Sequence, residues 1–266
     1  MDSRSRASTA TASGNSSKGA SLEARRNIGN ARRGAGKDVP KFDGTSIAIS
    51  ELQSSISRLS NSLFNSGLYS DLTVICGDDK YLVHKAVICP RSTFFEGACR
   101  HNFKEAITGE INLPADDPTA VKIMMNHFYN LNYSDGSATT SETDPALPGD
   151  KTSKFSLLVH AKVYSLAEKY GIASLKKLAV DKFERQARKE LDGEDFLEAA
   201  VEAYTGTVQA DRELRDEVVR TITLHMDVLK QESFREATSG LDIGVDVLVY
   251  LKEQGRIRSS DWANRW

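Results

Sequence analysis

The side chains able to do chemistry are scattered along this chain. Cys99 and His101 are close in sequence, but they lie two residues apart at an expected helix end and so point in different directions. The sequence also has no phosphate-binding glycine loop, nucleophile elbow or dinucleotide fingerprint. None of the histidines and cysteines has metal-ligand spacing beside further cysteines or carboxylates; they are His84, His101, His127, His160, His225, Cys76, Cys89 and Cys99. We therefore expect no metal site and no cofactor.

The paired carboxylates have a local explanation. Asp78-Asp79 and Asp116-Asp117 fall at expected turn and helix-cap positions, where aspartate is favoured for hydrogen bonds to nearby backbone. His84 is expected to be a hydrogen-bonded histidine buried by a hairpin, since it has no catalytic partner in the sequence. These patterns predict that the protein is not an enzyme.

Composition limits the class of protein further. The 35 basic and 37 acidic residues nearly balance, so no specific binding of nucleic acid is expected of the whole molecule. Three cysteines without Cys-x-x-Cys spacing favour reduced thiols in a cytoplasmic or nuclear protein. No apolar run reaches the roughly 20 residues that span a bilayer, so we expect no membrane association.

Three segments are predicted to lie outside the packed fold. Residues 1–45 are rich in Ser, Ala, Gly, Thr and Arg and should be disordered. Their basic residues favour a solvated tail over a nuclear localisation patch or a contact with anionic polymers, although both alternatives stay open. Residues 132–153 are expected to be a flexible insertion and residues 256–266 a tail.

A helix is expected to open the ordered part. Ser50-Glu51-Leu52-Gln53 has the form of a capping box, and Gly67 supplies a left-handed stop. Leu52, Ile56, Leu59 and Leu63 recur at helical spacing on one face. Such a narrow apolar stripe must be buried, either on its own domain or on a neighbouring chain, and we favour the neighbouring chain.

Strands and further helices are expected to follow. Residues 72–76 and 81–85 flank the hairpin turn 77–79, Ser92 or Thr93 caps a helix, and 110–113 form a brief strand. Asp117 caps a helix that starts at Pro118. Helical periodicity then predicts helices over residues 157–167, 175–183 (after a break at Gly171), 196–204 and, as one longer helix, 214–229. Residues 243–251 are apolar and could form a last helix, but their β-branched content leaves that assignment open. The fold class is therefore α+β.

This order of elements, with particular motifs, resembles the long form of the BTB/POZ fold, a small β-sheet flanked by a cluster of α-helices. The motifs are residues 70–74, 83–87, 91–95, 103–105 and 163–170, which together span about residues 49–188. The resemblance implies a BTB/POZ domain over 46–188 with a helical extension over 189–255. The polar insertion and the ending Ala167-Glu168-Lys169-Tyr170-Gly171 look most like fungal proteins with a single BTB domain.

What the resemblance implies is protein binding. It implies a homodimer in which the first helix, with Leu52, Ile56, Leu59 and Leu63, packs across the two-fold axis. Asp71 and Lys85 would form a charged patch near that axis, although Asp71 is equally well explained as an N-terminal cap of the first strand.

The resemblance also implies a second, more specific partner. Many family members are substrate adaptors for a cullin scaffold of ubiquitin ligases and use a hydrophobic-x-Glu segment, matched here by Phe103, Lys104 and Glu105. Physically, an exposed aromatic anchor beside a carboxylate suits an interface. The alternatives are that Phe103 packs under its own loop, that the protein is a scaffold or transcription-associated dimeriser without cullin binding, or, remotely, that the helical half holds an enzyme.

Overall fold

The computed structural model describes residues 44–100, 103–133, 156–189 and 191–257, and describes side chains from residue 49 onward. The expected disorder of residues 1–45 falls almost wholly outside these ranges. So do nearly all of the expected insertion at 132–153 and most of the tail at 256–266.

Helix α1 opens the described part and covers Gly44–Ser66. The prediction that a capping box at Ser50 starts this helix is wrong, because Ser50 lies more than a turn inside it. The predicted stop is confirmed: Gly67 has a φ of 62° and donates its backbone N–H to the carbonyl of Leu63 at 2.9 Å. A side chain at this position would also collide with Leu82, since a Cβ there would lie 2.9 Å from the Leu82 Cδ1 atom.

A three-stranded mixed sheet follows, in the order β2-β1-β3. Strand β1 (Leu72–Cys76) pairs antiparallel with β2 (Asp79–Val83), and Gly77 turns the hairpin with a φ of 57°. Strand β3 (Glu110–Asn112) pairs parallel with β1, so that Val74 lies opposite Ile111. Leu72, Val74 and Cys76 of β1 are buried and alternate with partly exposed residues, as a sheet with one covered face requires.

Short helices connect β2 to β3. They are α2 (Lys85–Ile88), the 3₁₀ turn η1 (Cys89–Arg91), α3 (Thr93–Cys99) and α4 (Lys104–Thr108). Of the two predicted caps for α3, Ser92 is the one used, because its hydroxyl accepts the backbone N–H of Phe95 at 3.2 Å. The same hydroxyl donates to the carbonyl of Tyr170 at 2.6 Å, so this cap also joins two distant parts of the chain.

Three long helices complete the core. Helix α5 (Pro118–Asn130) starts at the predicted cap, since Asp117 accepts the N–H of Ala120 at 3.0 Å. Helices α6 (Leu157–Lys169) and α7 (Ala173–Lys189) are separated at Gly171, where φ is 63° and the Thr93 hydroxyl would lie 2.0 Å from a Cβ. Fully buried side chains such as Phe95, Phe128, Tyr164 and Phe183 join these elements into one core.

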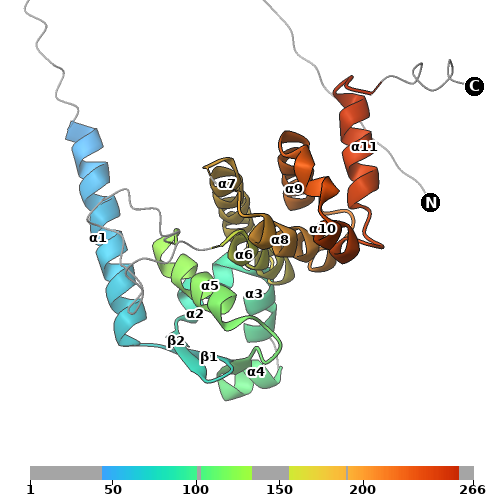
Figure 1. Cartoon of the computed structure of the whole chain (residues 1–266). Helices are drawn as coiled ribbons and strands as arrows, with labels where there is room; N and C mark the ends of the chain where they lie inside the picture. Colours follow the sequence, from blue (N-terminus) through green and yellow to red (C-terminus); the bar gives the residue numbers. More distant parts are fainter. Residues whose placement is uncertain (1–43, 101–102, 134–155, 190, 258–266) are drawn as a thin grey trace, which may run out of the picture. The chain divides into compact units, whose positions relative to one another are not determined.

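A run of helices extends the core, as expected for residues 189–255. It consists of α8 (Gly193–Thr205), α9 (Glu213–Leu224), the 3₁₀ turn η2 (Met226–Lys230), α10 (Glu232–Ala237) and α11 (Ile243–Glu253), which Figure 1 shows in orange to red. Asp195 of α8 accepts the first amides of α6, from Leu157 at 2.7 Å and Leu158 at 3.1 Å. Polar contacts therefore fasten the extension to the core.

One prediction for this extension is wrong. The regular spacing of Leu214, Val218, Ile222, His225 and Leu229 predicted a single longer helix, but α9 ends at Leu224. His225 has φ −126° and ψ 57°, outside the helical region, and a 3₁₀ turn follows. In the turn Val228 is buried and Leu229 packs partly against the core, whereas His225 is exposed. The open assignment at 243–251 is resolved as a helix.

Candidate protein interaction surfaces

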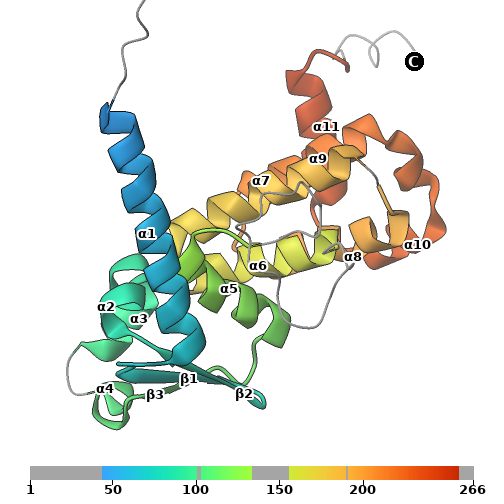
Figure 2. The same ribbon diagram turned by 90° about the vertical axis from the view of Figure 1, so that its left-hand side faces the viewer.

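The first surface is the outer face of α1. Ile49, Leu52, Ile56 and Leu59 are 50%, 60%, 54% and 62% exposed, although all are large aliphatic side chains. In both views the upper end of α1 projects past the elements beside it (Figures 1 and 2). Leu63, the last residue of the predicted stripe, instead packs partly against the core. Four of the five apolar residues on this face of α1 thus lie open to solvent.

The lower end of α1 is firmly anchored. The ring of Phe64 stacks on that of Tyr129 in α5, with centroids 4.9 Å apart. The hydroxyl of Tyr129 accepts the backbone N–H of His84 at 2.9 Å and lies 2.8 Å from Nδ1 of the same residue. Nε2 of His84 lies 2.7 Å from the carbonyl of Leu68, just after α1. A carbonyl only accepts, so Nε2 carries the proton and Nδ1 accepts from Tyr129.

His84 is thus buried and hydrogen-bonded at both ring nitrogens, and it holds the base of α1. Burial raises the pKa of Tyr129, while its hydrogen bond with the backbone of His84 acts in the opposite direction. The hydroxyl therefore stays protonated and keeps donating to His84 at physiological pH.

Asp71 and Lys85 are in contact, through a backbone group. The carboxylate Oδ1 of Asp71 accepts the backbone N–H of Lys85, the first residue of α2, at 2.7 Å. Asp71, the residue before β1, therefore caps the first amide of α2 rather than the strand that follows it.

The second surface lies at α4. Phe103 is 55% exposed at the helix start and Ile107 is 75% exposed one turn later, so the two lie on the same side. Lys104 is exposed and Glu105 is partly buried. The carbonyl of Glu105 accepts the N–H of Gly109, whose φ of 68° ends the helix. The sequence pattern had identified Phe103, Lys104 and Glu105, but not Ile107.

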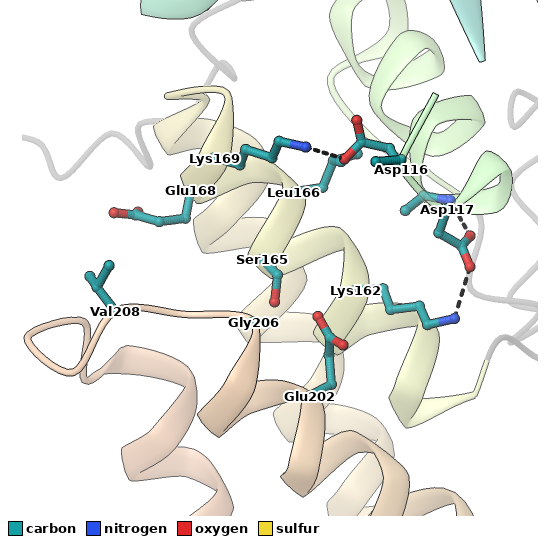
Figure 3. Close-up of a pocket in the computed structure, with 12 residues that line it drawn as sticks. Asp116, Asp117, Lys162, Ser165, Leu166, Glu168, Lys169, Glu202, Gly206 and Val208 are labelled. Atoms are coloured by element: carbon teal, nitrogen blue, oxygen red, sulfur yellow. Dashed lines mark hydrogen bonds and ion pairs between the residues drawn. The ribbon is translucent and has the colours of Figure 1, made fainter. Parts of the chain in front are cut away.

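A cavity of about 480 Å³ lies between the loop before α5 and helices α6 and α8. Most of its charged groups are paired (Figure 3). Asp116 contacts the Lys169 ammonium at 2.7 Å and the Tyr170 hydroxyl at 2.5 Å, and Asp117 contacts Lys162 at 2.8 Å. Burial raises the pKa of Asp117, but the hydrogen bond from Lys162 and those from backbone amides outweigh it and leave that pKa lowered. Asp117 is thereby held ionised as a structural partner of Lys162, and Asp116 joins the start of α5 to the end of α6.

The residues that the structure describes hold no group of three or more His, Cys, Asp or Glu side chains able to bind a metal ion. Within the same residues, no helix has both the length and the apolar character needed to cross a bilayer.

Comparison with known proteins identifies the fold. Residues 60–144 match the family model of the BTB/POZ domain. Over 121 residues the chain is 26% identical to a TD and POZ domain-containing protein 1-like of Mus musculus, with 46% of this chain and 28% of that protein covered. The BTB domain of zebrafish PATZ1 aligns with 52% of this chain and 95% of its own length, at 13% identity and a TM-score of 0.38.

Residues 60–144 therefore belong to a BTB/POZ fold, which in this chain has a small mixed sheet of three strands and a helical extension. Homologues with this domain are protein interaction modules. The chain spans about a quarter of the length of the mouse relative. The expected likeness to fungal proteins with a single BTB domain stays a prediction.

Proposed function

We propose that this protein is a homodimeric protein interaction module and that α1 pairs with α1 of a second copy. The observation that supports it is the spacing of the exposed face. Ile49, Leu52, Ile56, Leu59 and Leu63 follow one another at steps of three, four, three and four residues. Steps that alternate between three and four residues place apolar side chains along the line where two helices pack side by side, here called the seam.

The anchoring of α1 supports the same proposal. Because Phe64 and Leu63 fix the lower end of α1 on α5, the exposed part is presented in one orientation instead of folding back on its own chain. A preformed face loses less conformational entropy when it pairs. In this proposal Leu63 lies at the edge of the seam, and Asp71 and Lys85 lie near its base.

The test replaces two seam residues. Each buried leucine contributes about 1.5–3 kcal/mol, so Leu52→Asp with Leu59→Asp should weaken the dimer about a hundredfold or more. Ser54→Asp with Asn65→Asp adds the same charge on the opposite side of α1 and should leave the dimer unchanged. Sedimentation equilibrium of the full chain measures both. A wild-type chain that sediments as a monomer over the micromolar range would sink the proposal.

We further propose, as the leading specific role, that the α4 surface binds a cullin scaffold, as the family resemblance implies for Phe103, Lys104 and Glu105. The exposure of Phe103 and Ile107 on one side of α4 supports it, since an aromatic and an aliphatic side chain together form an interface anchor. A scaffold or transcription-associated dimeriser is the alternative, and it would leave this surface for another partner.

Titration calorimetry with a purified cullin separates these alternatives. Phe103→Ala and Ile107→Ala should each weaken binding about tenfold or more, because hot-spot truncations cost more than about 1.4 kcal/mol. Leu224→Ala removes a comparably exposed side chain at the end of α9 and is the matched control. Equal binding by all three variants would overturn the α4 surface as the binding site. A wild-type chain that binds no cullin while its dimer is intact would favour the dimeriser without cullin binding.

A further inference from the structure

The last helix has an apolar face that its own chain leaves uncovered among the described residues. Helix α11 buries Ile243, Val247 and Leu251 against the rest of the extension. On its other side Val245, Leu248 and Val249 are 60%, 59% and 48% exposed. A helix that is apolar on both sides is ordinarily covered on both sides.

The chain reverses direction directly after α11. Gly255 has a φ of 67°, its N–H bonds the carbonyl of Lys252 at 3.0 Å, and the N–H of Arg256 bonds the carbonyl of Leu251 at 2.9 Å. These two bonds form a Schellman turn. Ile257 then packs partly against the core. The described chain therefore ends at Ile257 with its direction reversed relative to α11.

Residues 258–266 have the composition to cover this face. The chain contains two tryptophans, and both lie here, at Trp262 and Trp266. A tryptophan buries roughly 150–250 Å² when it packs, so two of them match the area of a face made by three aliphatic side chains.

The distances also fit. Leu248 lies seven residues before Gly255, about 10 Å along the helix axis. Trp262 lies five residues after Ile257, and an extended chain of that length reaches at most about 17 Å. A tether this short holds the two groups at millimolar effective concentration, far above that of a second copy in dilute solution.

We propose that residues 258–266 of the same chain dock on the outer face of α11, with Trp262 or Trp266 in contact with Val245, Leu248 and Val249. The occupant is this segment, in cis. The docking is independent of the pairing of α1, because it uses other residues and needs no second copy.

Intrinsic fluorescence reads out this proposal directly, since every tryptophan of the chain lies in the docking segment. The measurement is made on the full chain carrying Leu52→Asp and Leu59→Asp, so that α1 pairing does not contribute. The reference for exposed tryptophan is a synthetic peptide of residues 256–266. We expect the protein to show bluer emission and weaker quenching by acrylamide than the peptide, independent of protein concentration.

Two variants then locate the contact. Leu248→Asp and Val245→Asp each place a charge on the exposed face and should lower the ratio of docked to free segment about tenfold, which shifts emission and quenching toward those of the peptide. Ile107→Asp introduces the same charge at another exposed aliphatic position, in α4, and should change neither. Far-UV circular dichroism verifies that each variant is folded. If Leu248→Asp is unfolded, the test uses Val245→Asp alone.

Three results would overturn the proposal. One is peptide-like quenching in the parent protein. Another is shielded tryptophan that becomes exposed on dilution, which would assign the face to a second copy. The third is shielding that survives both α11 substitutions in folded protein, which would place the tryptophans on another surface.

Discussion

Helices α1 and α11 each carry exposed apolar side chains, but they do so in different ways. In α1 the exposed stripe is narrow, most other residues from Ser50 to Asn61 are polar, and the lower end is anchored to the core. In α11 both sides are apolar and one of them is already buried along the whole helix. The first arrangement suits a partner of similar length, and the second suits a cover supplied close by in the same chain.

The largest effect should separate the two sides of α11. Val247→Asp buries an unpaired charge at a position that is 3% exposed, and it should lower the free energy of unfolding by about 4 kcal/mol. Leu248→Asp, one residue later on the exposed side, should cost less than about 1.5 kcal/mol. Urea denaturation of both variants measures the difference. Equal losses would mean that the two sides of α11 are equally buried in solution.

The next effect concerns α5, which carries the anchor of α1. His127 is 2% exposed, and its Nε2 contacts the Ser174 hydroxyl of α7 at 2.9 Å. Burial, with a smaller contribution from the positive charge of Arg91, lowers the pKa of His127 to about 4. The folded state therefore binds fewer protons than the unfolded state between the ordinary histidine pKa of about 6.5 and pH 4.

Neutral His127 makes its full contribution to the free energy of unfolding above pH 6.5. That contribution, about 3 kcal/mol in total, is lost as the pH falls toward 4. His127→Gln keeps a polar side chain but cannot titrate, so its free energy of unfolding should fall less over this range. Urea denaturation at pH 7, 5.5 and 4.5 checks this. If the free energy of unfolding fell by the same amount with pH in the variant and the wild type, His127 would not be the group responsible for the pH dependence.

A smaller effect is expected at the base of α1. Tyr129→Phe deprives the buried backbone N–H and ring of His84 of a partner and should cost about 2 kcal/mol in unfolding free energy. It should also weaken the proposed dimer, because the orientation of α1 depends on this contact. Tyr81→Phe removes a hydroxyl whose bond to Asp79 is exposed and long, 3.3 Å, and is the matched control. A dimer that withstands Tyr129→Phe would show that α1 finds its orientation without this anchor.

The smallest effect distinguishes two roles of Asp71. Asp71→Ala removes the cap on Lys85 and should cost about 1 kcal/mol in thermal or urea unfolding. Asp71→Asn retains an acceptor oxygen without the charge, so it should keep most of that stability. If the dimer weakens with Asp71→Asn while stability holds, the charge acts at the interface. If neither changes, Asp71 is only a cap.

The parts of the fold that were predictable from the sequence depend on neighbours in the sequence. Gly67, Gly77 and Gly171 end or turn their elements as expected, and Ser92 and Asp117 cap theirs, because each acts on backbone within a few residues. The start of α1 was missed because the capping pattern at Ser50 also occurs inside helices. The break at His225 was missed because Leu229 continues the spacing of leucine, valine and isoleucine in the sequence, although the backbone there forms a 3₁₀ turn that buries Val228 instead.

The residues of the two candidate surfaces were also only partly predictable from local sequence patterns. Leu52, Ile56 and Leu59 were identifiable from periodicity, whereas Ile49 fell before the expected helix start and Ile107 outside the recognised motif. The contacts of His84 with Tyr129 and Leu68, and of Asp71 with Lys85, join residues 14 to 45 positions apart. Such contacts depend on how the chain folds back on itself, and no local pattern encodes them.

The way α6 begins has a practical use. Ser156 accepts the N–H of Val159, and Asp195 accepts those of Leu157 and Leu158, so the first turn of α6 is completed without any group from residues 134–155. Tyr133 is buried on the other side of that segment. A fluorescent reporter domain or an affinity tag inserted between Tyr133 and Ser156 should therefore leave the start of α6 folded.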